Sequence, residues 1–197
     1  MVKRLLIKIN KKDSTCLRFE YSQLTLWINV LTKNICFHNN IKWLQYRLVR
    51  RVLPTNKILC KFVPGTINAC SICGMLNDTI SHTFVHCMPT SSFWSELSIL
   101  LQNLGLTIEI NEKSILFGNF KKAAMSFDNL LLLYAKKFIW ECKLKGSSPI
   151  ILSFKTYLLS LILSLKLSFA ILNKSEQLDE GWHIFHEHLV SEHGRGG

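Results

Sequence analysis

The sequence predicts a mainly α-helical protein with one short Cys- and His-rich turn embedded between its helices. Hydrophobic residues make up 48% of the 197 positions, and the leucines among them favour helices. Only 4 prolines and 9 glycines are present, so few long loops are expected. Cysteine and histidine concentrate in one stretch, CSICGMLNDTISHTFVHC, at residues 70–87.

The excess of positive over negative charge lies entirely in the first third of the chain. Residues 1–61 hold 13 Lys or Arg against Asp13 and Glu20, which accounts for the whole net charge of +11. The other 136 residues hold 11 basic and 11 acidic side chains. A one-sided basic region attracts polyanions, such as nucleic acid or an anionic membrane. The alternative is a merely solvated basic face.

The first predicted elements lie in this basic region. Residues 1–23 form a weakly patterned lead-in, and residues 24–35 a short helix or strand. Asn39 or Asn40 is a suitable N-cap for a helix over residues 41–53, which Pro54 ends. A second short helix, with Thr55 as its cap, is expected to reach Phe62.

The helix over residues 41–53 is amphipathic. One side carries Ile41, Leu48, Val49 and Val52, and the other carries Trp43, Tyr46, Arg47, Arg50 and Arg51, with Lys57 and Lys61 beyond the break. Arginine binds phosphate through paired hydrogen bonds. An aromatic ring among arginines can stack on unpaired bases. These seven residues are therefore the candidate nucleic-acid contacts, although core packing is the alternative for Trp43 and Tyr46.

Four residues of the cluster have the spacing of a metal site. Cys70, Cys73, His82 and Cys87 form the pattern C-x2-C-x8-H-x4-C, and Gly74 lets the turn between the first two close. Three thiolates and one imidazole suit one structural zinc ion, with no position left for a reactive water. His86 is a rival to His82, but it directly precedes Cys87 and is expected to point elsewhere.

Helices are expected to follow the cluster. One begins at Ser91 or Ser92 and reaches Asn103, while residues 107–115 show some strand-like alternation. Asp128 is expected to cap a long helix that runs to about Lys145. After the linker 146–149, residues 151–172 form an apolar helix. Lys155 and Lys166 lie inside that helix, so it is predicted to pack on the protein rather than to enter a membrane. The His-rich segment 181–197 is expected to be a polar, disordered tail.

Two stretches together resemble a known family. They are IKWLQYRLVRRVLPTNKILCKF and ACSICGMLNDTISHTFVHCMPTSSFWSEL, followed by ILFGN and AKKFIWECKLK further on. These motifs resemble the zinc-binding domain at the C-terminal end of LINE-type (non-LTR) retrotransposon reverse transcriptases. The resemblance covers residues 24–145 and divides the chain into the lead-in 1–23, this domain, the apolar helix 146–180 and the tail 181–197. It implies zinc ligation by the four residues named above.

The resemblance also implies a role in holding template RNA or target DNA during reverse transcription. No paired aspartates for a polymerase site are present, because the chain has only four Asp, none of them adjacent. We therefore expect a non-enzymatic module that binds RNA or DNA with little sequence specificity and takes no small-molecule substrate. The alternative is a zinc-stabilised protein-interaction module that binds an acidic partner. The odd cysteine count and the absence of a signal-peptide stretch favour an intracellular location, in cytoplasm or nucleus.

Overall fold

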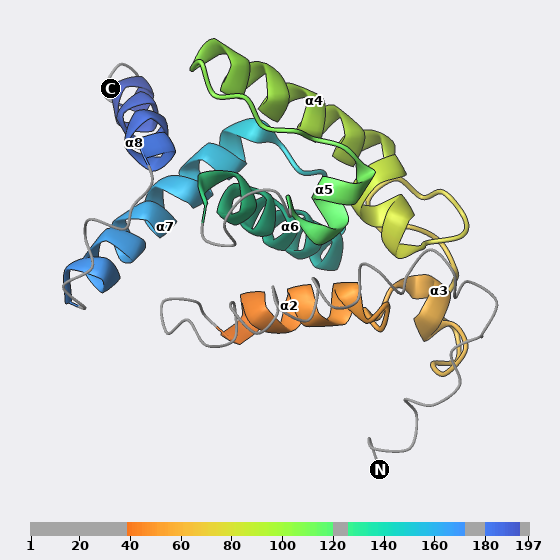
Figure 1. Cartoon of the computed structure of the whole chain (residues 1–197). Coiled ribbons are helices and arrows are strands. Elements are labelled where there is room, and N and C mark those ends of the chain that lie inside the picture. The colour runs from red at the N-terminus through yellow and green to blue at the C-terminus, as the bar shows by residue number, and fades with distance from the viewer. Residues whose placement is uncertain (1–38, 120–125, 172–179, 194–197) are drawn as a thin grey trace.

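The computed structural model describes residues 39–119, 126–171 and 180–193. Helices dominate these residues, which confirms the predicted fold class (Figure 1). Their bounds are α2 Asn39–Val49, α3 Asn56–Leu59, the π-helical turn η3 His82–His86, α4 Met88–Asn103, α5 Glu112–Phe117, α6 Phe127–Lys145, α7 Ile151–Ile171 and α8 Glu180–His193. The predicted lead-in and the element at residues 24–35 lie outside the described residues.

Helix α6 forms the centre of the fold. Every residue from Phe127 to Lys136 is buried, and α2, α5, η3, α7 and α8 all contact this helix. Its C-terminus closes at Gly146 in the left-handed conformation, with φ of 65°, which glycine adopts at little cost. The predicted helix is confirmed to its end at Lys145, but it starts two residues early, because Ser126 rather than Asp128 is the N-cap.

Helix α2 buries the predicted apolar side, with Ile41 and Leu48 in the core, but it ends earlier than predicted. It stops at Val49 instead of Leu53, because Arg51 takes a left-handed φ of 55°. Arg51 N–H donates to Leu48 O at 3.0 Å, and Val52 N–H donates to Arg47 O at 2.9 Å. This pair of bonds is a Schellman motif, which satisfies the last carbonyls of the helix without a glycine. Pro54 therefore follows the helix end rather than causing it.

Helix α7 packs through an aromatic cluster that joins three helices. The Phe154 ring centroid lies 5.2 Å from those of both Phe93 on α4 and Phe138 on α6. Leu158 and Ile162, one and two turns further along α7, are also fully buried. Within the described part of the chain, no helix is both long enough and apolar enough to cross a membrane.

The prediction of a disordered tail from residue 181 is wrong for residues 181–193, which form most of α8. Trp182, Phe185 and Leu189 are buried, at the helical spacing i, i+3 and i+7. The Trp182 ring lies 4.9 Å from that of Phe127, nearly perpendicular to it. The burial of two aromatic side chains outweighs the polar, His-rich composition that suggested disorder.

Candidate metal centre and basic face

The four predicted metal ligands converge in the structure. Their donor atoms all lie within 4.8 Å of one another. Cys70 Sγ is 3.9 Å from Cys87 Sγ, and Cys73 Sγ is 3.3 Å from His82 Nε2. In a tetrahedral zinc site the metal–sulfur distance of about 2.3 Å places sulfurs about 3.8 Å apart, and a sulfur and nitrogen about 3.6 Å apart. The spacing therefore fits one tetrahedral ion.

Cys70 and Cys73 lie on a tight turn. Gly74 N–H donates to Cys70 O, and Cys70 N–H donates to Met75 O, both at 2.8 Å. Gly74 has φ of 75°, so the role predicted for it is confirmed. A single antiparallel bridge between Ala69 and Leu76 closes the base of the turn. We call residues 70–87 the knuckle.

His82 and Cys87 are brought together by the π-turn η3. Residues five apart in an α-helix differ in direction by about 140°, so an ordinary helix would separate the two side chains. Here Cys87 N–H donates to His82 O at 2.7 Å, which widens the turn. The Thr79 hydroxyl accepts a hydrogen bond from His82 N–H at 2.9 Å, which satisfies a backbone donor at the start of this turn.

His86, the rival to His82, lies outside the cluster. Its side chain is 59% exposed, and its Nε2 is 3.8 Å from Glu112 Oε1 on α5. The ring therefore points toward solvent, while His82 points toward Cys73. The geometry favours His82 as the histidine of the set.

The protonation of the cluster depends on whether a cation is bound. Burial, a hydrogen bond with the Cys73 thiol and the neighbouring Cys70 together raise the pKa of Cys87 to about 12. Burial also lowers the pKa of His82, which keeps its imidazole neutral and able to coordinate. Cys87 is in addition the N-cap of α4, where the helix dipole favours negative charge. A bound divalent cation would offset the repulsion among the thiolates.

Asp78 holds the knuckle to the rest of the protein, and the sequence analysis assigned it no such role. Its buried carboxylate accepts hydrogen bonds from Lys143 Nζ, Asn56 N–H and Thr83 Oγ1 at 2.7–3.0 Å. It thereby caps α3, for which Thr55 is the N-cap residue but supplies no side-chain bond. One signal was present in the sequence, since Asp78 is the single acidic residue between positions 39 and 95.

The side chains of the predicted contact face are on the surface. Trp43 is 57% exposed, and Tyr46 is half-buried beside it, with ring centroids 5.6 Å apart. The basic members of this face are all exposed, namely Arg47, Arg50, Arg51, Lys57 and Lys61. Core packing, the alternative for Trp43, is thus excluded. We call these seven residues the basic face.

Two cation–π contacts order part of this face. The Arg47 guanidinium carbon lies 5.8 Å from the Trp43 ring centroid, and that of Arg50 lies 5.8 Å from the Tyr46 ring centroid. The opposite side of α2 enters the core through Ile41, Leu44 and Leu48. Because Asp78 is buried and paired, no exposed carboxylate lies among residues 39–95. Within residues 39–95, the exposed charge on this face is therefore all positive.

Comparison with known proteins finds a family match for part of this chain. No curated protein matches it. The matching family model ends at Trp94, so it includes α2, α3, the knuckle and the start of α4, while the later motifs of the resemblance lie beyond it. Residues 12–94 match the family described as zinc-binding in reverse transcriptase, and all four clustered ligands lie within that match.

Proposed function

We propose that this chain is a zinc-stabilised nucleic-acid-binding module without a catalytic centre of its own. It resembles the C-terminal region of LINE-type reverse transcriptases, and its task would be to hold template RNA or target DNA. The observation that carries the proposal is the basic face, where exposed Trp43 lies among exposed arginines and residues 39–95 contribute no exposed carboxylate. Phosphates would contact Arg47, Arg50, Arg51, Lys57 and Lys61.

Zinc is the metal that fits the four ligands best. Three sulfurs and one imidazole nitrogen are soft or borderline donors, which suit zinc better than magnesium or calcium. Four protein ligands fill a tetrahedral shell, so the ion would stabilise the fold and would not activate water. The family match supports the same ion.

Hydrogen bonds from the knuckle hold α3, and with it part of the basic face, in position. Asp78, inside the knuckle, accepts a hydrogen bond from Asn56 N–H, and its own carbonyl accepts one from Lys57 N–H at 3.3 Å. Asn56 Nδ2 donates to Ala69 O, directly before Cys70, at 2.6 Å. Helix α3, with Lys57, is thus fixed to the knuckle. Loss of the metal is expected to release this part of the face first.

Salt-dependent binding of a labelled single-stranded RNA, and of the DNA of the same sequence, tests the proposal. Each lost phosphate contact reduces the slope of log K against log salt by about 0.7. Arg47→Ala and Arg50→Ala should each show that reduction, while Lys145→Ala, at an exposed site on the C-terminal turn of α6, should not. Trp43→Ala should weaken binding roughly tenfold if the ring stacks on a base, and Trp43→Phe should restore part of it.

The proposal fails if binding is absent, or if it has the same salt slope in the arginine variants as in the unmodified protein. An acidic peptide that binds the same face while RNA does not would favour the protein-interaction alternative. Zinc content, measured on every variant, separates loss of a contact from loss of the fold.

A further inference from the structure

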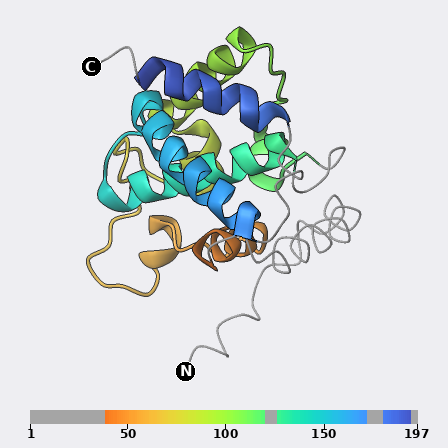
Figure 2. The same cartoon turned by 90° about the vertical axis from the view of Figure 1, so that its left-hand side faces the viewer.

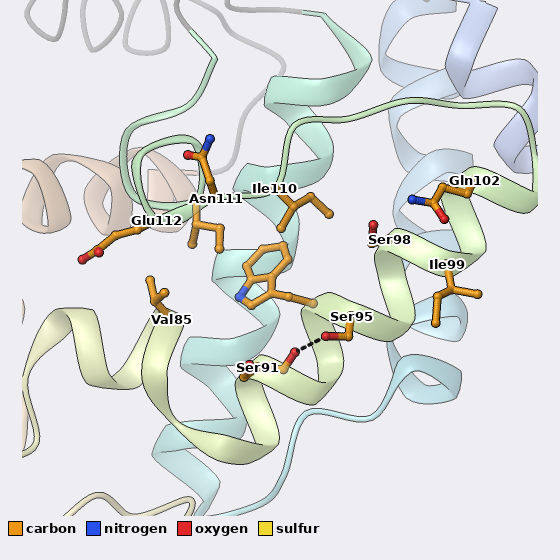
Figure 3. Close-up of a pocket in the computed structure, with 11 residues that line it drawn as sticks. Val85, Ser91, Ser95, Ser98, Ile99, Gln102, Ile110, Asn111 and Glu112 are labelled. Carbon is orange, nitrogen blue, oxygen red and sulfur yellow. Dashed lines mark hydrogen bonds between the residues drawn. The ribbon is translucent and has the colours of Figure 1, made fainter.

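A second surface lies on the side of the molecule away from the basic face. Figures 1 and 2 show α2 and α4 on opposite sides of the central helix α6. Between α4 and the segment that leads into α5 there is an open groove of about 440 Å³, shown in Figure 3. No part of the proposed nucleic-acid contact set lines it.

The groove combines an apolar part with a wall of small side chains. Trp94, Ile110 and Ile115 supply the apolar part. Ser91, Ser95 and Ser98 follow one another along α4 at i, i+4 and i+7 and form the wall (Figure 3). Small side chains in such a row let the backbone of a second helix approach closely.

Several polar groups of the groove already have partners inside the protein. Trp94 Nε1–H donates to Phe84 O at 2.7 Å, and Ser95 Oγ donates to Ser91 O at 3.1 Å. Because Trp94 is only 4% exposed, it offers a ligand no more than a small apolar part of its indole. Such a surface suits aliphatic or aromatic side chains better than sugars or phosphates.

The charge around the groove is the reverse of that on the basic face. Residues 88–113 contain Glu96, Glu109 and Glu112 and a single basic residue, Lys113, which does not line the groove. All three glutamates are exposed, and Glu112 lines the groove itself. Like charges repel a phosphate backbone and favour a cationic partner.

We propose that this groove binds a basic amphipathic helix of a partner protein. Apolar side chains spaced i, i+4 and i+7 would enter between the serine wall and Trp94, and flanking lysines or arginines would face Glu109 and Glu112. Because the basic face lies on the other side of α6, nucleic acid and this partner would bind at the same time. The module would then connect a nucleic acid to a second protein.

A designed helix tests the proposal on the full, zinc-loaded chain. The probe is a fluorescein-labelled, alanine-based peptide with leucines at i, i+4 and i+7 and lysines beside them; a second peptide carries glutamates in place of the lysines. The lysine peptide should bind at least about tenfold more tightly than the glutamate peptide, as measured by anisotropy. Ser95→Trp, which fills the groove, and Glu112→Lys, which reverses its charge, should each weaken the lysine peptide about tenfold. Glu187→Lys, at an exposed position on α8, is the matched control and should not.

Four results would overturn the inference. Equal affinity of both peptides, or unchanged affinity in Ser95→Trp and Glu112→Lys, would show that the groove does not select a basic helix. Loss of RNA binding in Ser95→Trp would assign the groove to nucleic acid. Concentration-dependent self-association that Ser95→Trp abolishes would assign it to a second copy of the chain. RNA binding by the basic face is tested by different variants, so either proposal can fail alone.

Discussion

Asp78 and Lys143 form a buried ion pair that joins the knuckle to the last turn of α6. Lys143 Nζ lies 2.8 Å from Asp78 Oδ1 and 2.7 Å from Oδ2. The side chains are 0% and 4% exposed for Asp78 and Lys143 respectively, and they are 65 positions apart in the sequence. Because the same carboxylate caps α3, one residue connects the candidate metal centre, the basic face and the central helix.

Lys143→Met should destabilise the protein by about 3–5 kcal/mol, because it leaves the Asp78 carboxylate buried without its counter-charge. Urea unfolding followed by circular dichroism measures the loss. Hydrogen exchange should show the largest fall in protection at Asn56 and Lys57, whose N–H groups bond to Asp78.

Lys137→Met is the control on the same helix. Lys137 pairs with Glu141 one turn along, and both side chains are partly exposed, so this pair should contribute less than about 1 kcal/mol. Equal losses in the two variants would show that the Asp78–Lys143 pair has no special structural role.

Replacing the two histidines of the knuckle should separate a ligand from its neighbour. His82→Ala should weaken zinc binding by more than about tenfold, since it removes one of four donor atoms. His86→Ala should leave zinc affinity unchanged, because that side chain points to solvent. Competition with a chromophoric chelator measures both affinities. A larger effect of His86→Ala would reverse the assignment.

The sequence alone predicted the helices and the ligand set because both depend on local spacing. Amphipathic periodicity placed α2, long apolar runs placed α6 and α7, and the C-x2-C-x8-H-x4-C pattern specified the four residues that the structure brings together. The π-turn that aligns His82 with Cys87 corresponds to no recognisable sequence pattern. It depends on Cys87 N–H bonding to His82 O, and nothing in the residue types of this stretch requires it.

The buried polar contacts could not be predicted because their partners are far apart in the chain. Lys136 Nζ donates to Gln45 Oε1 at 2.6 Å across 91 positions. The docking of α8 was missed for a related reason, since Trp182, Phe185 and Leu189 are few among many polar residues.

Lys136 should make the stability of the protein depend on pH. Complete burial lowers its pKa from 10.5 to about 7. Between these two values the unfolded chain binds more protons than the folded one, so the free energy of unfolding should rise with pH. For one proton the maximum slope is about 1.4 kcal/mol per pH unit. Lys136→Met should remove this contribution, as shown by urea unfolding at several pH values between about 7 and 10.

The difference between Lys136→Met and the unmodified protein is the quantity to compare, because it cancels the contributions of all other titrating groups. Lys137→Met, next along α6 and partly exposed, should keep the slope of the unmodified protein. If the free energy of unfolding varied with pH in the same way for all three proteins, Lys136 would have to be protonated equally in the folded and unfolded states.

Gly181→Ala should weaken the docking of α8. A Cβ atom at Gly181 would lie 2.7 Å from Phe127 Cγ, closer than real contacts allow. The strain should cost on the order of 1–3 kcal/mol and expose Trp182 to solvent, which a red shift of tryptophan fluorescence would report. Val190→Ala, at a half-exposed site on the same helix, should change neither. An unaltered spectrum in Gly181→Ala would contradict the packing of α8 on Phe127.

Arg51→Gly should stabilise the fold while it weakens nucleic-acid binding. Arg51 has φ of 55°, a left-handed conformation that costs a non-glycine residue about 1 kcal/mol. Glycine removes that strain, so urea unfolding should show a gain of about 1 kcal/mol. The loss of one exposed cation should also reduce the salt slope of RNA binding by about 0.7. Arg50→Gly, one residue earlier and without a positive φ, should show the same reduced slope but no gain in stability.

If both variants gain stability equally, strain at Arg51 is not the cause of the gain. If neither variant alters the salt slope, the end of α2 makes no phosphate contact.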